Sequence, residues 1–312
     1  MLAPVAPPGV IERIERVERG HSSTNCRVEI RGGTPLHLRL VPGGRRVAAK
    51  EVAVQRLVSP TVPISPVLYE AAHAAHPYYV ARWIDDAVPL DRVLAGEQLE
   101  DATGLGAVVG RTLAAIHHYT FDRAGDLGEA LEVVPWDHGG GPPEADGQQG
   151  SSYARLLHGL LFRGRAYGRL GAELSEQLWS RILMEDAACD ESRERSCVVH
   201  FDFNPKNLLV RSGLDGWSVA AVLDWEFAAS ADAMFDVGNF LRHRADYPSE
   251  LVEGFISEYQ SNAPWVTPDW LRRARFLDLS SQLENLGSAQ EKPTGHRVAR
   301  ALVDDFLKGS TR

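Results

Sequence analysis

One stretch decides the fold of this chain, VVHFDFNPKNLLV at residues 198–210, and a second follows it closely, VLDWE at residues 222–226. The first stretch is an apolar approach, a tight polar turn and an apolar strand, and the second is another apolar strand. Short hydrophobic runs bounded by turn residues predict strands. The turn therefore carries Asp202 and Asn207 on one loop, and the second strand delivers Asp224 beside them.

These three side chains are the groups that phosphoryl transfer requires. The carboxylate of Asp202 can orient an attacking hydroxyl and accept its proton, while the oxygens of Asn207 and Asp224 are suitable ligands for Mg²⁺. Each residue alone has another interpretation, because Asp and Asn are also common in turns and at strand ends. Their combination, with hydrophobic strands on both sides, favours a catalytic loop beside a metal site.

The spacing HxDxxxxN at residues 200–207, with Asp224 at the end of the next hairpin, resembles the aminoglycoside phosphotransferase and choline kinase-like family. These small-molecule kinases are built on the protein-kinase fold. The resemblance implies Asp202 as the catalytic base, His200 as a catalytic-loop residue that braces the turn, and Asn207 and Asp224 as metal ligands. Family members usually have Gly at the position of Phe201, which adds bulk beside the loop.

The resemblance also implies the fold class, an α+β, bilobal protein-kinase-like fold. The chain before residue 85 has the β-β-α-β order of a small N-terminal β-sheet lobe, and the remainder is mostly helical. We therefore predict a nucleotide-binding lobe at residues 1–84 and a larger catalytic and acceptor-binding lobe at residues 85–312. Residues 11–19 are predicted as a short amphipathic turn or helix, because apolar side chains recur there at helical spacing.

The contacts to the nucleotide phosphates are predicted on the first lobe. Arg39 occupies the strand position where kinases carry a Lys for the phosphates, and Glu51, on the following helix, is its expected ion-pair partner. The alternative is a surface Arg and an exposed helix Glu. Ser22 and Ser23 lie earlier in the chain, in the loop before the strand predicted at residues 26–30. They are predicted to cover the phosphates, although a plain β-turn explains them nearly as well.

The same resemblance implies which residues contact the nucleotide base and which bind the acceptor. The backbone of Arg82, Trp83 and Ile84 is expected to form the connection between the lobes and to contact the base of ATP or GTP. Four polar residues of a C-terminal helix are candidates for binding the acceptor, and a solvated helix face is the alternative explanation for them. These residues are Asp278, Gln282, Glu284 and Asn285.

Composition limits the partners. The 312 residues include 33 Lys and Arg against 42 Asp and Glu, and the resulting net charge of -9 argues against nucleic acid and suits a cationic small molecule. Three sparse cysteines indicate reduced thiols and a cytoplasmic protein. No apolar run approaches the roughly 20 residues that span a bilayer. We expect a monomer or a homodimer without a membrane partner.

The sequence therefore predicts a Mg²⁺-dependent phosphotransferase that moves the γ-phosphoryl group of ATP or GTP to a hydroxyl of a small molecule. The acidic composition and the family resemblance favour an aminoglycoside or another basic antibiotic as the acceptor. One alternative is a metabolic kinase for choline, ethanolamine, homoserine or a sugar. Another is a pseudokinase that binds the nucleotide without catalysis, an interpretation against which the three intact residues of the loop argue.

Overall fold

The chain is organised as two units, each assembled from three separate segments. The computed structural model describes residues 2, 4–7, 9–17, 23–96, 99–136, 151–188 and 195–309. The first unit comprises the segments Met1–Trp136, Ser196–Ala231 and Tyr247–Pro264, and the second comprises Asp137–Arg195, Asp232–Asp246 and Trp265–Arg312.

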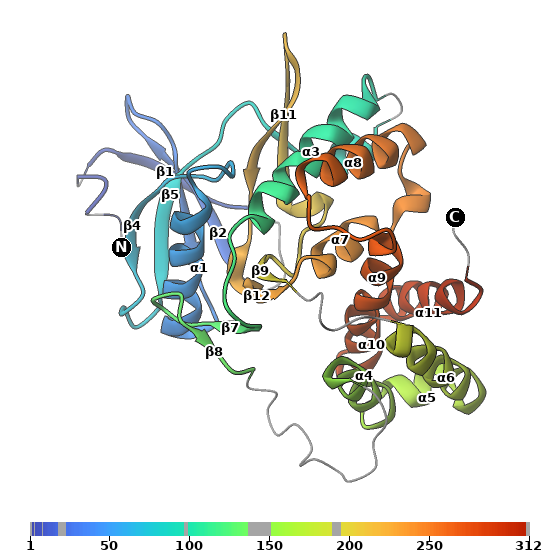
Figure 1. Cartoon of the computed structure of the whole chain (residues 1–312). Helices are drawn as coiled ribbons and strands as arrows, with labels where there is room; N and C mark the ends of the chain where they lie inside the picture. The colour runs from blue at the N-terminus through green and yellow to red at the C-terminus, as the bar shows by residue number, and fades with distance from the viewer. Residues whose placement is uncertain are drawn as a thin grey trace. The chain divides into compact units, whose positions relative to one another are not determined.

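An antiparallel sheet of five strands forms the N-terminal part of the first unit (Figure 1). Its order is β1 (Ile11–Val17), β2 (Thr24–Ile30), β3 (Leu36–Leu40), β5 (Tyr78–Arg82) and β4 (Val67–Ala71). Side chains alternate between the two faces of a strand. One face buries Leu38 and Val80 in an apolar cluster, whereas Tyr79 and Ala81 pack on the opposite face against helix α1 (Gly44–Val58). The same alternation places Arg39 on the face that α1 covers.

Two smaller sheets hold the turn at residues 200–207 between them. Strand β9 (Ser196–Val199) enters the turn from a sheet of order β8-β7-β12-β9, and β10 (Leu208–Gly213) leaves it in a sheet of order β11-β10-β6. The remaining strands of these sheets are β6 (Val88–Pro89), β7 (Gly125–Leu127), β8 (Val133–Val134), β11 (Gly216–Val222) and β12 (Ala229–Asp232). Since β10 and β11 pair with Leu208 opposite Val222, the segment after β11 returns to the end of the turn.

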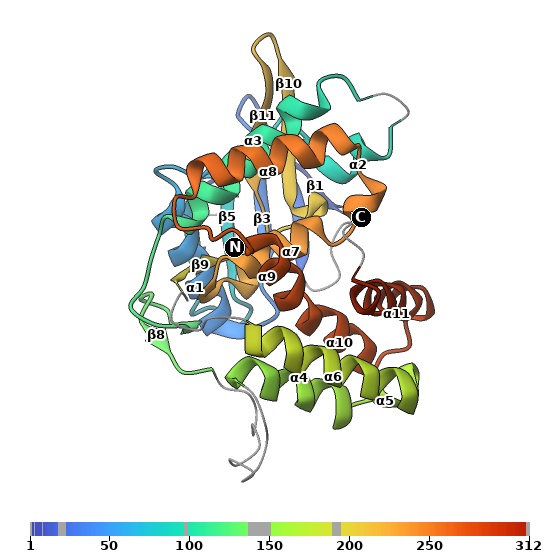
Figure 2. The same cartoon turned by 45° about the vertical axis from the view of Figure 1, so that its right-hand side comes forward.

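Helices α3 (Ala102–His117) and α8 (Ser249–Asn262) run side by side in the first unit, where the short helix α2 (Leu90–Leu94) precedes them (Figure 2). Glycines permit the close approach of the two backbones. A Cβ added to Gly106 would lie 2.0 Å from the carbonyl oxygen of Leu251, and one added to Gly110 would lie 2.4 Å from that of Phe255. A buried hydrogen bond of 2.8 Å between His117 and Tyr259 joins the far end of the pair.

The second unit is helical within the described residues. Its helices are α4 (Ser152–Phe162), α5 (Ala166–Leu170), α6 (Ala172–Ala188), α7 (Met234–Leu241), α9 (Trp270–Leu277), α10 (Leu279–Gly287) and α11 (Pro293–Leu307). Helix α9 ends and α10 begins at Asp278, so the chain bends there. None of the described helices combines the length with the apolar character that a membrane crossing needs.

The fold class predicted from the sequence is confirmed, with an antiparallel N-terminal sheet followed by a mainly helical C-terminal part. The helix or turn predicted at residues 11–19 is wrong, because Ile11–Val17 is strand β1. Its apolar residues have helical spacing, but pairing with β2 satisfies the backbone of β1, and Ile14 remains 52% exposed. The short edge strand β4 was missed. The division of the lobes at residue 84 remains a prediction.

The glycine contacts between α3 and α8 predict opposite effects for two identical substitutions. Gly106→Ala should lower the free energy of unfolding by about 1–3 kcal/mol, because the new methyl group overpacks against the α8 backbone. Gly159→Ala, in α4, meets no atom within 4 Å and should raise stability by up to about 1 kcal/mol through helix propensity. Urea unfolding of both variants measures the difference, and equal effects would contradict the proposed close packing.

Candidate active site

The turn at residues 200–207, the catalytic loop, is anchored by a buried histidine. The Nε2 atom of His200 donates a hydrogen bond of 2.8 Å to the carbonyl oxygen of Leu223, and its Nδ1 atom accepts one of 3.3 Å from the backbone N–H of Asp202. These two bonds together define the Nε2–H tautomer. The imidazole therefore connects the catalytic loop to the end of β11, which is a bracing role.

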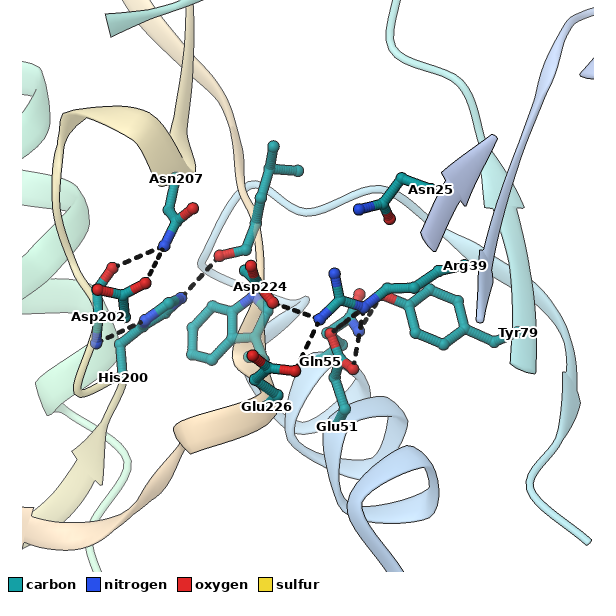
Figure 3. Close-up of polar contacts among 12 residues, drawn as sticks. Asn25, Arg39, Glu51, Gln55, Tyr79, His200, Asp202, Asn207, Asp224 and Glu226 are labelled. Atoms are coloured by element: carbon teal, nitrogen blue, oxygen red, sulfur yellow. Dashed lines mark hydrogen bonds and ion pairs between the residues drawn. The ribbon is translucent and has the colours of Figure 1, made fainter. Parts of the chain in front are cut away.

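Two amide side chains, of Asn204 and Asn207, hold the carboxylate of Asp202, and Figure 3 shows the second of them. Asn204 donates to its Oδ1 atom at 2.7 Å, and Asn207 donates to its Oδ2 atom at 2.8 Å. Both amides also donate to the carbonyl oxygen of Asp202, at 3.2 and 2.9 Å. The carboxylate is thus oriented by its own loop while its side chain stays partly exposed to solvent. Sequence analysis did not identify Asn204, although Asn before Pro is a recognisable turn signal.

Phe201 has an unusual backbone conformation for its residue type. Its φ angle is 62°, in the left-handed region that glycine adopts freely. An L-residue with a side chain adopts this conformation at a cost of roughly 1–2 kcal/mol. The flanking residues His200 and Phe203 are fully buried, so the loop is fixed on both sides of the strained position. Phe201 is therefore held in a glycine-like conformation.

Asn207 and Asp224 approach each other through the backbone. The N–H of Leu223 donates to the carbonyl oxygen of Asn207 at 2.8 Å, which places the next residue, Asp224, beside the catalytic loop. The nitrogen of the Asn207 side chain is turned toward Asp202, and its oxygen points to the opposite side (Figure 3). An amide oxygen and a carboxylate are thus presented from two adjacent loops.

Asn207 and Asp224 fit a Mg²⁺ ion whose remaining ligands are phosphate oxygens and water. Mg²⁺ prefers oxygen ligands and is commonly held by one or two protein groups together with nucleotide phosphates. Among the described residues, no group of three or more His, Cys, Asp and Glu side chains forms a self-sufficient metal site. Asn207 and Asp224 match the partial donor set that such a shared ion requires.

Arg39 lies at the centre of a buried cluster of carboxylates. Its side chain is 3% exposed, and its Nε atom lies 3.1 Å from Oε1 of Glu51, which is fully buried. One terminal nitrogen contacts Oδ1 of Asp224 and lies 3.4 Å from Oε2 of Glu226. The ion pair expected between Arg39 and Glu51 is therefore present, and neither residue is the surface group of the alternative interpretation.

The cluster carries more negative than positive charge. Burial is the main cause that raises the pKa of Glu51 to about 7; Arg39 opposes the rise, and Asp224 and Glu226 add to it. Tyr79 donates a hydrogen bond of 3.1 Å to Glu51 and limits the rise further. Three carboxylates around one guanidinium are electrostatically suited to a site that receives a divalent cation.

His37 is a second residue that sequence analysis did not identify. It lies on β3 two residues before Arg39, hence on the same face of the strand. Its Nε2 atom lies 2.8 Å from Oδ1 of Asn25, and its ring packs edge-on against Tyr79 and Trp83. Burial lowers its pKa to about 4, with Arg39 contributing and Asp224 opposing. An uncharged imidazole thus lies next to the guanidinium.

The other residues predicted to bind the nucleotide are two serines before β2 and the segment at the end of β5. Ser22 lies outside the described residues, and Ser23 is buried. The N–H groups of Arg82 and Trp83 already donate to the carbonyl oxygens of Pro66 and Pro35, at 3.1 and 3.0 Å. These two N–H groups already have hydrogen-bond acceptors within the protein, and Ile84 is the next residue along the chain. Base binding by this segment stays a prediction.

The four predicted acceptor residues lie on or next to α10 in the second unit. Asp278 forms a two-pronged ion pair with Arg242, with a closest distance of 2.7 Å, and accepts a hydrogen bond of 2.9 Å from Gln282. Asn285 contacts the carbonyl oxygen of Gly295 at 3.5 Å, and Glu284 is exposed. Asp278 and Gln282 therefore stabilise the helix junction, and acceptor binding by these residues stays a prediction.

Comparison with known proteins identifies the family. The family model described as "Phosphotransferase enzyme family" matches residues 13–276. The chain therefore belongs to this family, and it is an enzyme that phosphorylates small molecules. A search of curated protein sequences finds no match.

Solved structures share the fold at low sequence identity. A thermostable mutant of the aminoglycoside phosphotransferase APH(4)-Ia, in complex with AMP-PNP and hygromycin B, has a TM-score of 0.68 at 16% identity, covering 99% of this chain and 97% of that chain. The macrolide 2'-phosphotransferase MphH from Brachybacterium faecium has 0.64 at 19%, covering 97% and 96%. A putative fructosamine-3-kinase from Thermobifida fusca has 0.58 at 16%, covering 96% and 94%.

The lowered pKa of His37 predicts a pH dependence of stability. Below pH 6.5 the unfolded chain protonates this residue, but the folded protein resists protonation until about pH 4. Its contribution to stability is therefore complete above pH 6.5 and is lost as the pH falls through this window, on the order of 1 kcal/mol per pH unit. His37→Gln should show a shallower loss of unfolding free energy between pH 7 and 4.5. Parallel profiles for both proteins would contradict the assignment.

Proposed function

We propose that this enzyme transfers the γ-phosphoryl group of Mg²⁺-bound ATP or GTP to a hydroxyl of a small cationic acceptor. The observation that carries the proposal is the joint arrangement of Asp202, Asn207, Asp224 and Arg39 within one unit (Figure 3). A protein that only binds a nucleotide does not require a partly exposed carboxylate held by two amides. That feature favours catalysis over the pseudokinase interpretation.

Asp202 acts on the acceptor hydroxyl. In a loose transition state the attacking oxygen needs to be positioned more than it needs to be deprotonated early. Asn204 and Asn207 hold the carboxylate before an acceptor arrives, so little reorganisation is needed when the hydroxyl binds. The proton of the hydroxyl passes to a carboxylate oxygen of Asp202 as the new bond between oxygen and the γ-phosphorus forms, while the bond from the γ-phosphorus to the bridging β-phosphate oxygen breaks and the nucleoside diphosphate leaves.

Arg39 acts on the phosphates. Its guanidinium presents several N–H donors in one plane, and Glu51 fixes the direction of that plane through the Nε atom. The terminal nitrogen that contacts Asp224 is the donor proposed to contact a phosphate oxygen. When bound by Asn207 and Asp224, Mg²⁺ supplies charge neutralisation at the phosphates.

The acceptor class rests on charge. The catalytic cluster has four carboxylates, on Asp202, Glu51, Asp224 and Glu226, against the guanidinium of Arg39. A nucleotide brings further negative charge, so a cationic acceptor is favoured electrostatically. The named acceptors of the similar structures differ, namely hygromycin B, a macrolide and a fructosamine.

An acceptor panel tests this proposal. Release of nucleoside diphosphate is measured with Mg·ATP and Mg·GTP in the presence of aminoglycosides, macrolides, fructosamines, choline, ethanolamine, homoserine and neutral sugars. Stimulation by a basic antibiotic supports the proposal, whereas stimulation by a metabolite indicates a metabolic kinase. Nucleotide binding without stimulation by any acceptor would count against the proposed reaction.

Asp202→Asn should lower the acceptor-stimulated rate by about 100- to 10,000-fold, the range expected for loss of a general base. The amide has nearly the same shape, so the binding of Mg·ADP should stay within about threefold of wild type. Asp215→Asn, in the exposed turn of the β10–β11 hairpin, is the matched control and should retain the wild-type rate. A folded Asp202→Asn protein with near-wild-type turnover would remove this residue from the catalytic role.

Asp224→Asn should weaken the dependence of nucleotide binding on Mg²⁺. The neutral amide is a poorer ligand than a carboxylate, so the Mg²⁺ concentration at half-maximal ADP binding should rise by about tenfold or more. Calorimetric titration of ADP at a series of Mg²⁺ concentrations provides a readout without turnover. An unchanged Mg²⁺ requirement, in a variant that unfolds cooperatively, would show that Asp224 does not bind the metal.

A further inference from the structure

An aromatic pair lies next to the proposed catalytic base. The ring of Phe201 packs edge-to-face against the indole of Trp136, with a centroid separation of 6.0 Å and an interplanar angle of 84°. Both residues belong to the first unit, and Trp136 follows strand β8. The indole is 36% exposed, and Phe201 is half-buried. This pair thus forms a π surface that solvent reaches.

The backbone of Phe201 shows that the pair is not ordinary core packing. A bulky residue in the left-handed region is an outlier that a structure retains when the surroundings over-determine it, and such outliers gather at functional sites. Within the loop at residues 200–207, His200 and Phe203 are fully buried, whereas Phe201 is only half-buried. The fold therefore keeps a partly exposed aromatic residue in a backbone conformation that glycine would adopt without strain.

The position of this ring relates it to the reaction. Phe201 and Asp202 are consecutive, so their Cα atoms are about 3.8 Å apart. A molecule whose hydroxyl contacts the carboxylate of Asp202 therefore also lies close to the backbone that carries Phe201. The carboxylate is held by Asn204 and Asn207, which leaves the aromatic pair to contact the body of the acceptor instead of the reacting oxygen.

We propose that Phe201 and Trp136 form an aromatic wall that positions the acceptor beside Asp202 and selects one with a protonated amine near its hydroxyl. The inference rests on the proposed function. The face of an indole is the most strongly cation-attracting of the aromatic side chains. The surrounding carboxylates exclude an anionic acceptor by the same electrostatic argument. The two residues thus determine specificity, and they leave phosphate and metal binding to Arg39 and Asp224.

The test compares ring deletions with a matched control. Phe201→Gly deletes the ring at a position whose φ glycine adopts freely, so the catalytic loop should keep its conformation. Trp136→Phe and Trp136→Leu weaken and remove the cation-binding face. Trp217→Leu removes a half-exposed indole near the tip of the β10–β11 hairpin and is the control. The substrate is the amine-bearing acceptor that gives the largest response in the panel, assayed beside its N-acetylated form.

The wall predicts a change in KM for the acceptor alone. Phe201→Gly and Trp136→Leu should raise this KM about tenfold, Trp136→Phe by less, and Trp217→Leu not at all. The Kd of Mg·ADP and the cooperativity of unfolding should stay as in wild type. Acetylation of the amine should raise the acceptor KM of the wild-type enzyme. The ratio of the two KM values, acetylated over free amine, should fall toward one in Trp136→Leu, because the cation-binding ring is already gone.

Other results would overturn the inference. If Phe201→Gly and Trp136→Leu keep the acceptor KM within twofold, the rings do not contact the acceptor. If both forms of the acceptor lose the same factor in Trp136→Leu, the wall does not recognise the amine. Failure of the proposed function is distinguishable, because it would already show as a wild-type enzyme that no acceptor in the panel stimulates, and this inference would then fall with it.

Discussion

The guanidinium of Arg39 joins three parts of the first unit that are distant in sequence. It comes from β3, while its partners Glu51, Asp224 and Glu226 come from α1 and from the segment after β11. Burial of a charge is costly unless hydrogen-bonded ions of opposite sign surround it, and removal of one partner leaves an unpaired buried charge. The cluster therefore fixes the register between the sheet, the helix and the segment after β11. Nearly every residue with a proposed chemical role depends on that register.

The cluster also orients the groups that are proposed to bind a nucleotide. Arg39 already contacts the carboxylate of Asp224, and Asn207 already turns its nitrogen toward Asp202 and its oxygen away (Figure 3). Ligand-binding groups that are oriented during folding do not need to be ordered when the substrate binds. The structural cost is an excess of negative charge in a buried place; burial first, and then the neighbouring Asp224 and Glu226, raise the pKa of Glu51. A divalent cation is the natural complement to that excess.

Much of the fold could be predicted from the sequence because the strongest signals are local. The runs around Asp202 and Asp224 specify strands by hydrophobicity alone, and strand alternation is enough to bring Arg39 to Glu51. The two wrong or missing secondary-structure predictions concern strands that depend on pairing with another part of the chain. Strand β1 has helical spacing but pairs with β2 at the edge of a sheet, and the short strand β4 gives little periodic signal.

The candidate site was predicted in its charged residues and missed in its supporting ones. Asn204 carries only a general turn signal and His37 carries none, and the importance of both follows from contacts that only the folded chain makes. The strain at Phe201 is likewise invisible in the sequence, since a residue letter does not report its φ angle. For Asp278 the chemistry of the residue was suitable, but Arg242, 36 positions earlier, already engages its carboxylate.

The segmented construction of the first unit has a consequence for synthesis on the ribosome. Helix α3 offers Gly106 and Gly110 to a partner, α8, that follows about 140 residues later in the chain. Until Tyr247–Pro264 has left the exit tunnel, the face of α3 that contains Gly106 and Gly110 cannot pack against α8. All strands of the five-stranded sheet have emerged long before that point. A nascent chain at that stage exposes apolar surface and is a substrate for chaperones. The pace of translation through the intervening segments thus sets how long the emerging enzyme needs protection.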